Sequence, residues 1–215
     1  MCARYTLTVP ERLRELFPRM RFPAIKPRYN IAPSQPVLGA RNAGNGTAEL
    51  LLWGPVHINA RAETLAAKRS FKEALRTRRA LVFADGYIEW HARSGVLKQP
   101  YRVHLDADAP FAFAALWNEL PLEGEGTKYS CVLVTTQARA DLAWLHDRMP
   151  VILEPQAAEA WMNPDPLRPG SEAELLVQPS ARLVATPISR AVNSALRDEP
   201  LVLTPVEPPI QDSLF

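Results

Sequence analysis

The stretch ALVFADGYIEWH, residues 80–91, indicates the fold class of this chain. It contains two short runs, ALVFA and GYIEWH, that are rich in β-branched and aromatic residues and meet at Asp85 and Gly86. Apolar runs of this length, bounded by turn residues, are typical of β-strands. The stretch therefore predicts two consecutive strands on either side of Asp85-Gly86.

Similar strand-like runs continue along the chain: PYRVHL (100–105), FAFAALW (111–117), YSCVLVTT (129–136), MPVIL (149–153), ARLVATPIS (181–189) and PLVLTP (200–205). Residues 42–47, NAGNGT, predict a hairpin turn, and residues 141–146 a short helix or turn. Helical patterns cover residues 8–17, 61–79 (with Ser70 as a cap inside it) and 155–162. Strands in sequence with inserted helices predict an α+β fold, with a mostly antiparallel, barrel-like sheet and short flanking helices.

Length and composition favour one domain. The chain has 215 residues, of which 47% are hydrophobic, enough for a sizeable core. We expect this domain to span residues 1–205, followed by an acidic, proline-rich tail at 206–215. Because no apolar run approaches the length of a membrane span and charged residues interrupt the N-terminal stretch, we expect no membrane association and a cytoplasmic location.

Charge is divided unevenly along the chain. Residues 1–104 hold 18 Lys and Arg against 7 Asp and Glu, a net charge of +11, whereas residues 105–215 hold 7 against 16, a net charge of −9. Arginine outnumbers lysine 20 to 5, and its planar fork suits phosphates and bases. This pattern favours a nucleic-acid partner, although the two halves could instead pair with each other in the fold.

Four residues offer distinct chemical groups. If Met1 is removed, Cys2 carries a thiol beside an α-amine whose pKa is ordinarily about 8. A useful fraction of this amine is unprotonated at neutral pH and can attack an aldehyde. Asn59 offers an amide, Glu89 a carboxyl group within an apolar strand, and His146 an imidazole that titrates near neutrality. Taken alone, three of them have a structural alternative: Glu89 as a solvated strand carboxylate, His146 as a hydrogen-bonded structural residue, and Asn59 as the cap of a helix.

Metal and cofactor chemistry has no sequence support. The four histidines lack the spacing of metal ligands, and two distant cysteines, Cys2 and Cys131, form neither a zinc motif nor a disulfide framework. We therefore expect no metal and no cofactor.

Short motifs in order along nearly the whole chain resemble the SRAP family, which includes abasic-site processing proteins. They are Cys2, PRYNIAPSQ (27–35), WG (53–54), NARAET (59–64), RRALVFADGYIEW (78–90), KQPY (98–101), FAALW (113–117), TT (135–136), HDRMPVIL (146–153) and PISRAVN (187–193). The resemblance implies a DNA-binding channel that recognises abasic sites in single-stranded DNA. It further implies loss of Met1 and a thiazolidine cross-link between Cys2 and the abasic sugar.

By the same resemblance, Cys2 is the nucleophile, Asn59 positions its amine, Glu89 transfers protons, and His146 aids opening of the sugar ring. The expected DNA-binding residues are Arg4, Asn30, Pro33, Arg61, Trp90 and Arg148. The chain departs from the family pattern at Ala3, where glycine is common, at Ile88, where an aromatic residue is frequent, and in the shortened loop after Gly54. Two other functions remain open: a thiol peptidase or autopeptidase that uses Cys2, and a non-covalent reader of damaged single strands.

The last five residues, QDSLF, resemble peptides that dock on the replication sliding clamp. Such a peptide needs a mobile tail with apolar anchors, and Gln211, Leu214 and Phe215 would supply the contacts. The alternative is that the apolar pair folds back on the domain. We expect the protein to be a monomer that acts on DNA in the nucleoid.

Overall fold

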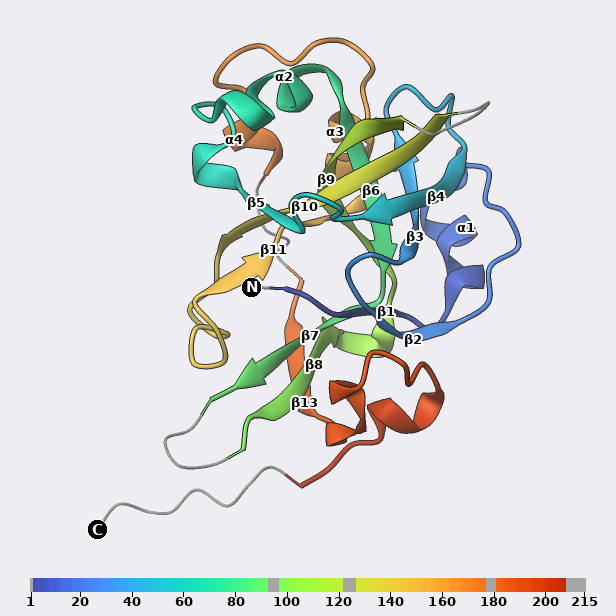
Figure 1. Cartoon of the computed structure of the whole chain (residues 1–215), viewed down its shortest axis with the longest axis vertical. Coiled ribbons are helices and arrows are strands. Elements are labelled where there is room, and N and C mark those ends of the chain that lie inside the picture. The colour runs from blue at the N-terminus through green and yellow to red at the C-terminus, as the bar shows by residue number, and fades with distance from the viewer. Residues whose placement is uncertain (1, 93–96, 122–126, 177–180, 208–215) are drawn as a thin grey trace.

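A computed structural model describes residues 2–92, 97–121, 127–176 and 181–207. These residues form two β-sheets, and Figure 1 shows the larger one above the smaller one. No helix within the described ranges is both long and apolar enough to cross a membrane.

The larger sheet closes into a five-stranded barrel. Strand β9 pairs with β6 on one side and with β10 on the other, which completes the ring β10-β4-β3-β6-β9. Only the β10–β4 pair of this ring is parallel. The strands of the ring are β3 (Pro36–Arg41), β4 (Ala48–Trp53), β6 (Arg79–Ala84), β9 (Phe111–Pro121) and β10 (Thr127–Gln137).

Three short strands extend this sheet. Strand β5 (Asn59–Arg61) runs parallel to β10, while β11 (Arg148–Pro150) pairs with β10 and β12 (Ile152–Leu153) with β9, both antiparallel. Because β5 and β11 both lie against β10, the sequence stretches near residues 59 and 146 are brought together at one end of the barrel.

The smaller sheet is antiparallel throughout, in the order β13-β8-β7-β1-β2. Its strands are β1 (Tyr5–Leu7), β2 (Arg28–Ile31), β7 (Gly86–His91), β8 (Gln99–Leu105) and β13 (Leu183–Pro187). The chain passes from the barrel into this sheet at Asp85, between β6 and β7. In Figure 1 the segment that leads into β1 lies between β11 of the barrel and β7 of the smaller sheet.

Short helices pack against strands of both sheets. The α-helices are α1 (Leu13–Leu16), α2 (Arg69–Thr77), α3 (Pro155–Trp161) and α4 (Glu172–Leu175), and the 3-10 helices are η1 (Pro10–Arg12), η2 (Ala62–Thr64), η3 (Asp106–Asp108), η4 (Arg190–Asn193) and η5 (Pro200–Leu203). Helix α2 buries Phe71, Ala74 and Leu75, the face that its periodicity predicts. All six residues of β6 are buried, as expected of a strand covered on both faces.

The predicted α+β class, the mostly antiparallel barrel-like sheet and the strands that flank Asp85-Gly86 are confirmed. Three local predictions are wrong. The helix predicted over residues 61–79 covers only Arg69–Thr77, because Arg61 ends strand β5, a separate 3-10 turn follows it, and Arg79 begins β6. Ser70 does not cap helix α2, because the helix begins at Arg69 with Lys68 as its N-cap. The run PLVLTP contains the 3-10 helix η5 rather than a strand, since Pro200 begins a turn that buries only Val202.

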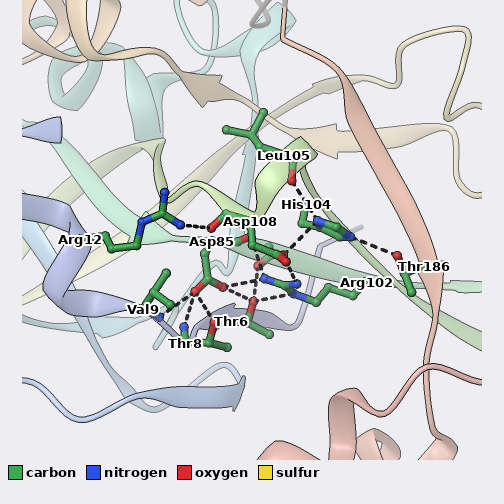
Figure 2. A network of polar contacts seen from close by, with 11 residues as sticks. Thr6, Thr8, Val9, Arg12, Asp85, Arg102, His104, Leu105, Asp108 and Thr186 are labelled. Atoms are coloured by element: carbon green, nitrogen blue, oxygen red, sulfur yellow. Dashed lines mark hydrogen bonds and ion pairs between the residues drawn. The ribbon is translucent and has the colours of Figure 1, made fainter. Parts of the chain in front are cut away.

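Asp85 anchors the crossing between the two sheets (Figure 2). Its carboxylate is fully buried and accepts hydrogen bonds from the Thr6 hydroxyl (2.6 Å), the Val9 amide (3.1 Å) and both the amide and hydroxyl of Thr8. The Arg102 guanidinium lies 3.1 Å from it and also binds Asp108. One buried carboxylate thus joins β1, β7 and β8.

Candidate functional site

Cys2 lies beside the strand that carries Glu89. The Arg4 carbonyl accepts a hydrogen bond from the Ile88 amide (2.9 Å), so that the chain before β1 continues along β7. The Asn59 side-chain amide donates to the Cys2 carbonyl at 2.8 Å. Segments from β1, β5 and β7 therefore hold Cys2 in one place.

The Cys2 thiol is buried and protonated. Its Sγ donates a weak hydrogen bond to the Arg4 carbonyl at 3.6 Å. Burial raises the pKa of Cys2 far above its ordinary value, and the negative charge of Glu89 raises it further. At neutral pH this sulfur is therefore a thiol, which is a poor first nucleophile.

Glu89 is buried on the face of β7 that is directed toward the barrel. Its cross-strand neighbour is Tyr101 of β8, and paired residues of neighbouring strands share a face. Burial raises the pKa of Glu89, while the positive charge of His146 opposes this rise. Glu89 therefore lies within electrostatic range of both Cys2 and His146.

His146 lies in the loop between β10 and β11, half-buried. Its Nδ1 accepts a hydrogen bond from the Arg148 amide at 2.9 Å and lies 2.9 Å from an Asp147 carboxylate oxygen. The amide hydrogen bond requires an unprotonated Nδ1, whereas the Asp147 contact requires a protonated one, so this loop has a partner for either state of the nitrogen. The loop thus fixes the orientation of the ring.

Asn59 lies in strand β5, not at the start of a helix. Its Nδ2 binds the Cys2 carbonyl, whereas its Oδ1 is buried and lacks a hydrogen-bond partner in the described part of the chain. A buried carbonyl oxygen without a donor carries a desolvation cost, so this atom is a suitable acceptor for an added N–H group.

Arg4 and Asn30 are both joined to the C-terminal segment. Asn30 is fully buried, and its amide donates to the carbonyls of Val192, Ser194 and Arg197. Arg4 donates to the Asn30 side chain at 2.9 Å and to the Val192 carbonyl at 2.8 Å. Burial lowers the pKa of Arg4. Asn30 therefore orients Arg4 from within the protein, and a direct DNA contact by Asn30 does not fit its burial.

Trp90 lies on the opposite face of β7 from Glu89, because neighbouring strand residues alternate in direction. It packs against the small cluster of Ile88, Ile188, Val192 and Val202, and its indole donates to Asn193 at 2.8 Å. The departure from the family pattern at Ile88 therefore concerns this cluster and not the side of Glu89. A cavity of about 410 Å³ adjoins Trp90 on this face, lined also by Leu97, Lys98, Arg190 and Asn193.

The remaining predicted DNA contacts differ in exposure. Arg61 is exposed at the end of β5, and Pro33 is half-buried in the turn after β2. Arg148 forms a double ion pair with Glu63, at 2.8 and 3.0 Å. Its hydrogen bonds lower the pKa of Glu63 to about 2. Arg61 is thus the more accessible cation, while Arg148 ties η2 to β11.

Ala3 is compatible with its position. Among the described residues other than glycine, a positive φ occurs at Ser34, Asn45 and Asp108 only. Ala3 therefore does not need the left-handed conformation that would favour glycine.

Three aromatic residues on the Glu89 side were not predicted from the sequence. The ring of Trp144 lies 5.3 Å from that of His91 and 5.1 Å from that of Tyr101. The alternation of β7 places His91 on the face of Glu89, and this pattern was available as a signal. The third member, Trp144, belongs to a loop whose position depends on the tertiary fold.

Other predicted features lie elsewhere or outside the described ranges. No cluster of three or more His, Cys, Asp or Glu side chains suited to a metal occurs in the described ranges. A cavity of about 890 Å³ lies between α1, the β3–β4 turn and α3, and none of the predicted site residues lines it. Gln211, Leu214 and Phe215 fall outside the residues that the structure describes.

Comparison with known proteins gives consistent matches. A family model described as SOS response associated peptidase (SRAP) matches residues 1–195. The chain is 33% identical to the abasic site processing protein YoaM of Bacillus subtilis, over 90% of this chain and 93% of YoaM. It is 32% identical to the abasic site processing protein YedK of Escherichia coli, over 83% of this chain and 85% of YedK.

Solved structures share the fold. A protein from Bacteroides thetaiotaomicron superimposes with a TM-score of 0.80 at 20% identity, covering 95% of this chain and 100% of its own. A phage-related protein from Bordetella bronchiseptica gives a TM-score of 0.68 at 31% identity, covering 88% of this chain and 95% of its own.

Proposed function

The chain belongs to the SOS response associated peptidase (SRAP) family, and we propose that it captures abasic sites in single-stranded DNA as a covalent adduct of Cys2. The observation that carries this proposal is the position of Asn59. Its amide holds the Cys2 carbonyl while its buried Oδ1 remains ready to accept another hydrogen bond. An α-amine on Cys2, generated by removal of Met1, would provide that donor.

The amine, not the thiol, makes the first attack. The buried thiol has a raised pKa and is protonated, whereas an α-amine is partly unprotonated at neutral pH. The amine nitrogen attacks the C1′ aldehyde of the opened sugar, and loss of one water gives an imine. The S–H bond then adds across the C=N bond: sulfur binds C1′, the thiol proton goes to nitrogen, and a thiazolidine ring closes.

Two acid–base groups serve these steps. Glu89 accepts a proton from the α-ammonium of Cys2 and returns it to the hydroxyl that leaves as water. In its protonated form His146, with the Asp147 carboxylate beside Nδ1, donates the Nε2 proton to the ring oxygen of the abasic sugar, which increases the supply of open aldehyde. Closing the ring with sulfur also prevents loss of a β-proton from the imine, a loss that would cut the strand.

Electrostatics favours this chemistry over the two other functions. A thiol peptidase needs a thiolate, and the environment of Cys2 opposes thiolate formation. A protein that only bound damaged single-stranded DNA, without a covalent step, would not need Cys2, Asn59 and Glu89 near one another. Arg4 and Arg61 are the proposed phosphate contacts, and the tail motif stays a prediction of sliding-clamp binding.

Replacing Glu89 with glutamine should slow adduct formation about a hundredfold, since general acid–base groups typically contribute about 10²–10⁴ in rate. The carboxylate is the active form, so the wild-type rate should rise as pH passes through the pKa of Glu89. Burial raises this pKa, which places the rise above the ordinary glutamate range. Single-turnover rates of adduct formation with an abasic oligonucleotide, measured across pH, should show this increase with pH (the acidic limb of the profile) in the wild type and not in Glu89→Gln.

Glu159→Gln is the matched control, because this carboxylate lies exposed on α3. It should keep both the rate and the acidic limb. Because the pKa of Glu89 is raised in the folded state, its stabilising contribution is present at low pH and is lost as pH rises through that pKa. Glu89→Gln should therefore be no less stable at neutral pH, and equal pH–rate profiles for all three proteins would remove Glu89 from the mechanism.

A further inference from the structure

We propose that the half-exposed ring of Trp144 is a stacking platform for the nucleobase beside the abasic site. The proposal rests on the proposed function, because it assigns a place to the DNA next to the reacting sugar. Trp144 is 49% exposed, whereas Tyr101, the residue of β8 whose ring it contacts, is 5% exposed. An exposed indole beside a reaction site needs an explanation, since tryptophan is usually well buried.

The ring is held in a fixed orientation. Its Nε1 donates to the Asp141 carbonyl at 3.1 Å. The Tyr101 ring meets it edge-on, at 5.1 Å and 86°, and the His91 ring lies at 5.3 Å with a tilt of 59°. Three contacts, one each from its own loop, β7 and β8, thus orient Trp144. A fixed ring reduces the entropy lost when a ligand stacks on its free surface.

The platform adjoins each acid–base group of the proposed site. Trp144 lies two residues before His146 in the same loop. Tyr101 is paired with Glu89 across β7 and β8, and His91 shares the face of Glu89 two residues along β7. A sugar held between Glu89 and His146 therefore has its neighbouring nucleotide within reach of this ring.

A nucleobase fits this surface better than a protein side chain does. Bases stack on aromatic side chains regardless of sequence, and each stacked base contributes about 1–3 kcal/mol, which is about 5- to 150-fold in affinity. A protein that captures lesions in any sequence needs this kind of contact, because base-specific hydrogen bonds would restrict its substrates. Trp90, on the opposite face of β7, does not share this position.

The test uses three single-stranded oligonucleotides with a central tetrahydrofuran residue, which cannot open to an aldehyde and so reports binding alone. The first has bases on both sides of this residue, and the second and third have a further tetrahydrofuran on the 5′ or the 3′ side. Trp144→Leu should weaken binding to the first about tenfold in fluorescence anisotropy. On one of the other two oligonucleotides, the one that lacks the stacked base, Trp144→Leu should bind less than about twofold more weakly than the wild type.

Trp144→Phe, which keeps a ring, should retain most of the affinity, and Leu50→Ala, an exposed apolar residue of β4, should bind like the wild type. Wild-type affinity in Trp144→Leu would overturn the platform. An equal loss of affinity on all three oligonucleotides would also overturn it, because that result would show that Trp144 only positions its loop. A thermal melt of each variant checks folding. Adduct formation with reactive abasic DNA is measured separately. If the wild-type protein binds DNA through Trp144 but forms no adduct, the covalent function is refuted and the platform is not.

Discussion

Cys2→Ala should form no adduct that survives denaturation with an abasic single strand, whereas the wild-type protein should convert the strand to a slowly migrating species. The variant keeps an α-amine after Met1 removal, so an imine can still form. Without sulfur the ring cannot close, and the imine either hydrolyses or loses a β-proton, which cuts the strand. Denaturing gels with an end-labelled oligonucleotide report both products, and we expect more cleavage with the variant.

Two further proteins test whether adduct formation needs only a thiol or a thiol beside the N-terminal α-amine. Cys131→Ala removes the other buried thiol, in barrel strand β10, and should retain adduct formation because that cysteine has no adjacent α-amine. A chain with a short, uncleaved extension before Cys2 keeps the thiol but lacks the amine, and should form no adduct. Full activity of the extended chain would show that the amine is dispensable.

Asp85→Ala should lower the free energy of unfolding by about 3–5 kcal/mol, the usual result of removing one partner of a buried ion pair. The substitution leaves the Arg102 guanidinium and the amides of Thr8 and Val9 without their buried acceptor. Because domains are stable by only about 5–15 kcal/mol, this is a large fraction of the total. Urea denaturation followed by circular dichroism measures the loss.

Asp108→Asn is the control for this network, because asparagine, unlike alanine, tolerates the positive φ of residue 108. Asp108 also binds Arg102, but its side chain is 54% exposed, so its loss should cost no more than about 1 kcal/mol. A similar cost for both variants would contradict the central position of Asp85. The network matters for the site because β7, which carries Glu89, begins immediately after Asp85, and Thr6 lies in the strand that follows Cys2.

Local signals predicted most of the fold. Strand composition around Asp85-Gly86 and the periodicity of Phe71, Ala74 and Leu75 depend on neighbours in sequence, and both features occur in the structure. Closure of the barrel could be anticipated only in outline, because the β9–β10 and β10–β4 pairings join distant residues. PLVLTP was misassigned because its apolar pattern suits a strand, and only tertiary packing on Val202 selects a 3-10 turn.

The site shows the same limit. Cys2, Asn59, Glu89 and His146 carry their chemistry in their residue types and motif order, so the sequence could nominate them. It could not show that Asn30 is buried behind Arg4, since this depends on docking of the segment near Val192. It also could not place Trp144 against Tyr101, because that contact joins a loop to a strand of another sheet.

The mass of the intact adduct tests the central claim most directly. After incubation with an abasic oligonucleotide, we expect a species whose mass equals that of the chain without Met1 plus the oligonucleotide, less one water, and which is stable without a reducing agent. Loss of one water reports attack by the amine. Because an unreduced imine has the same mass but hydrolyses, persistence of the species without a reducing agent reports addition of the thiol. A mass that retained Met1, or only the separate masses of protein and oligonucleotide, would contradict the central claim.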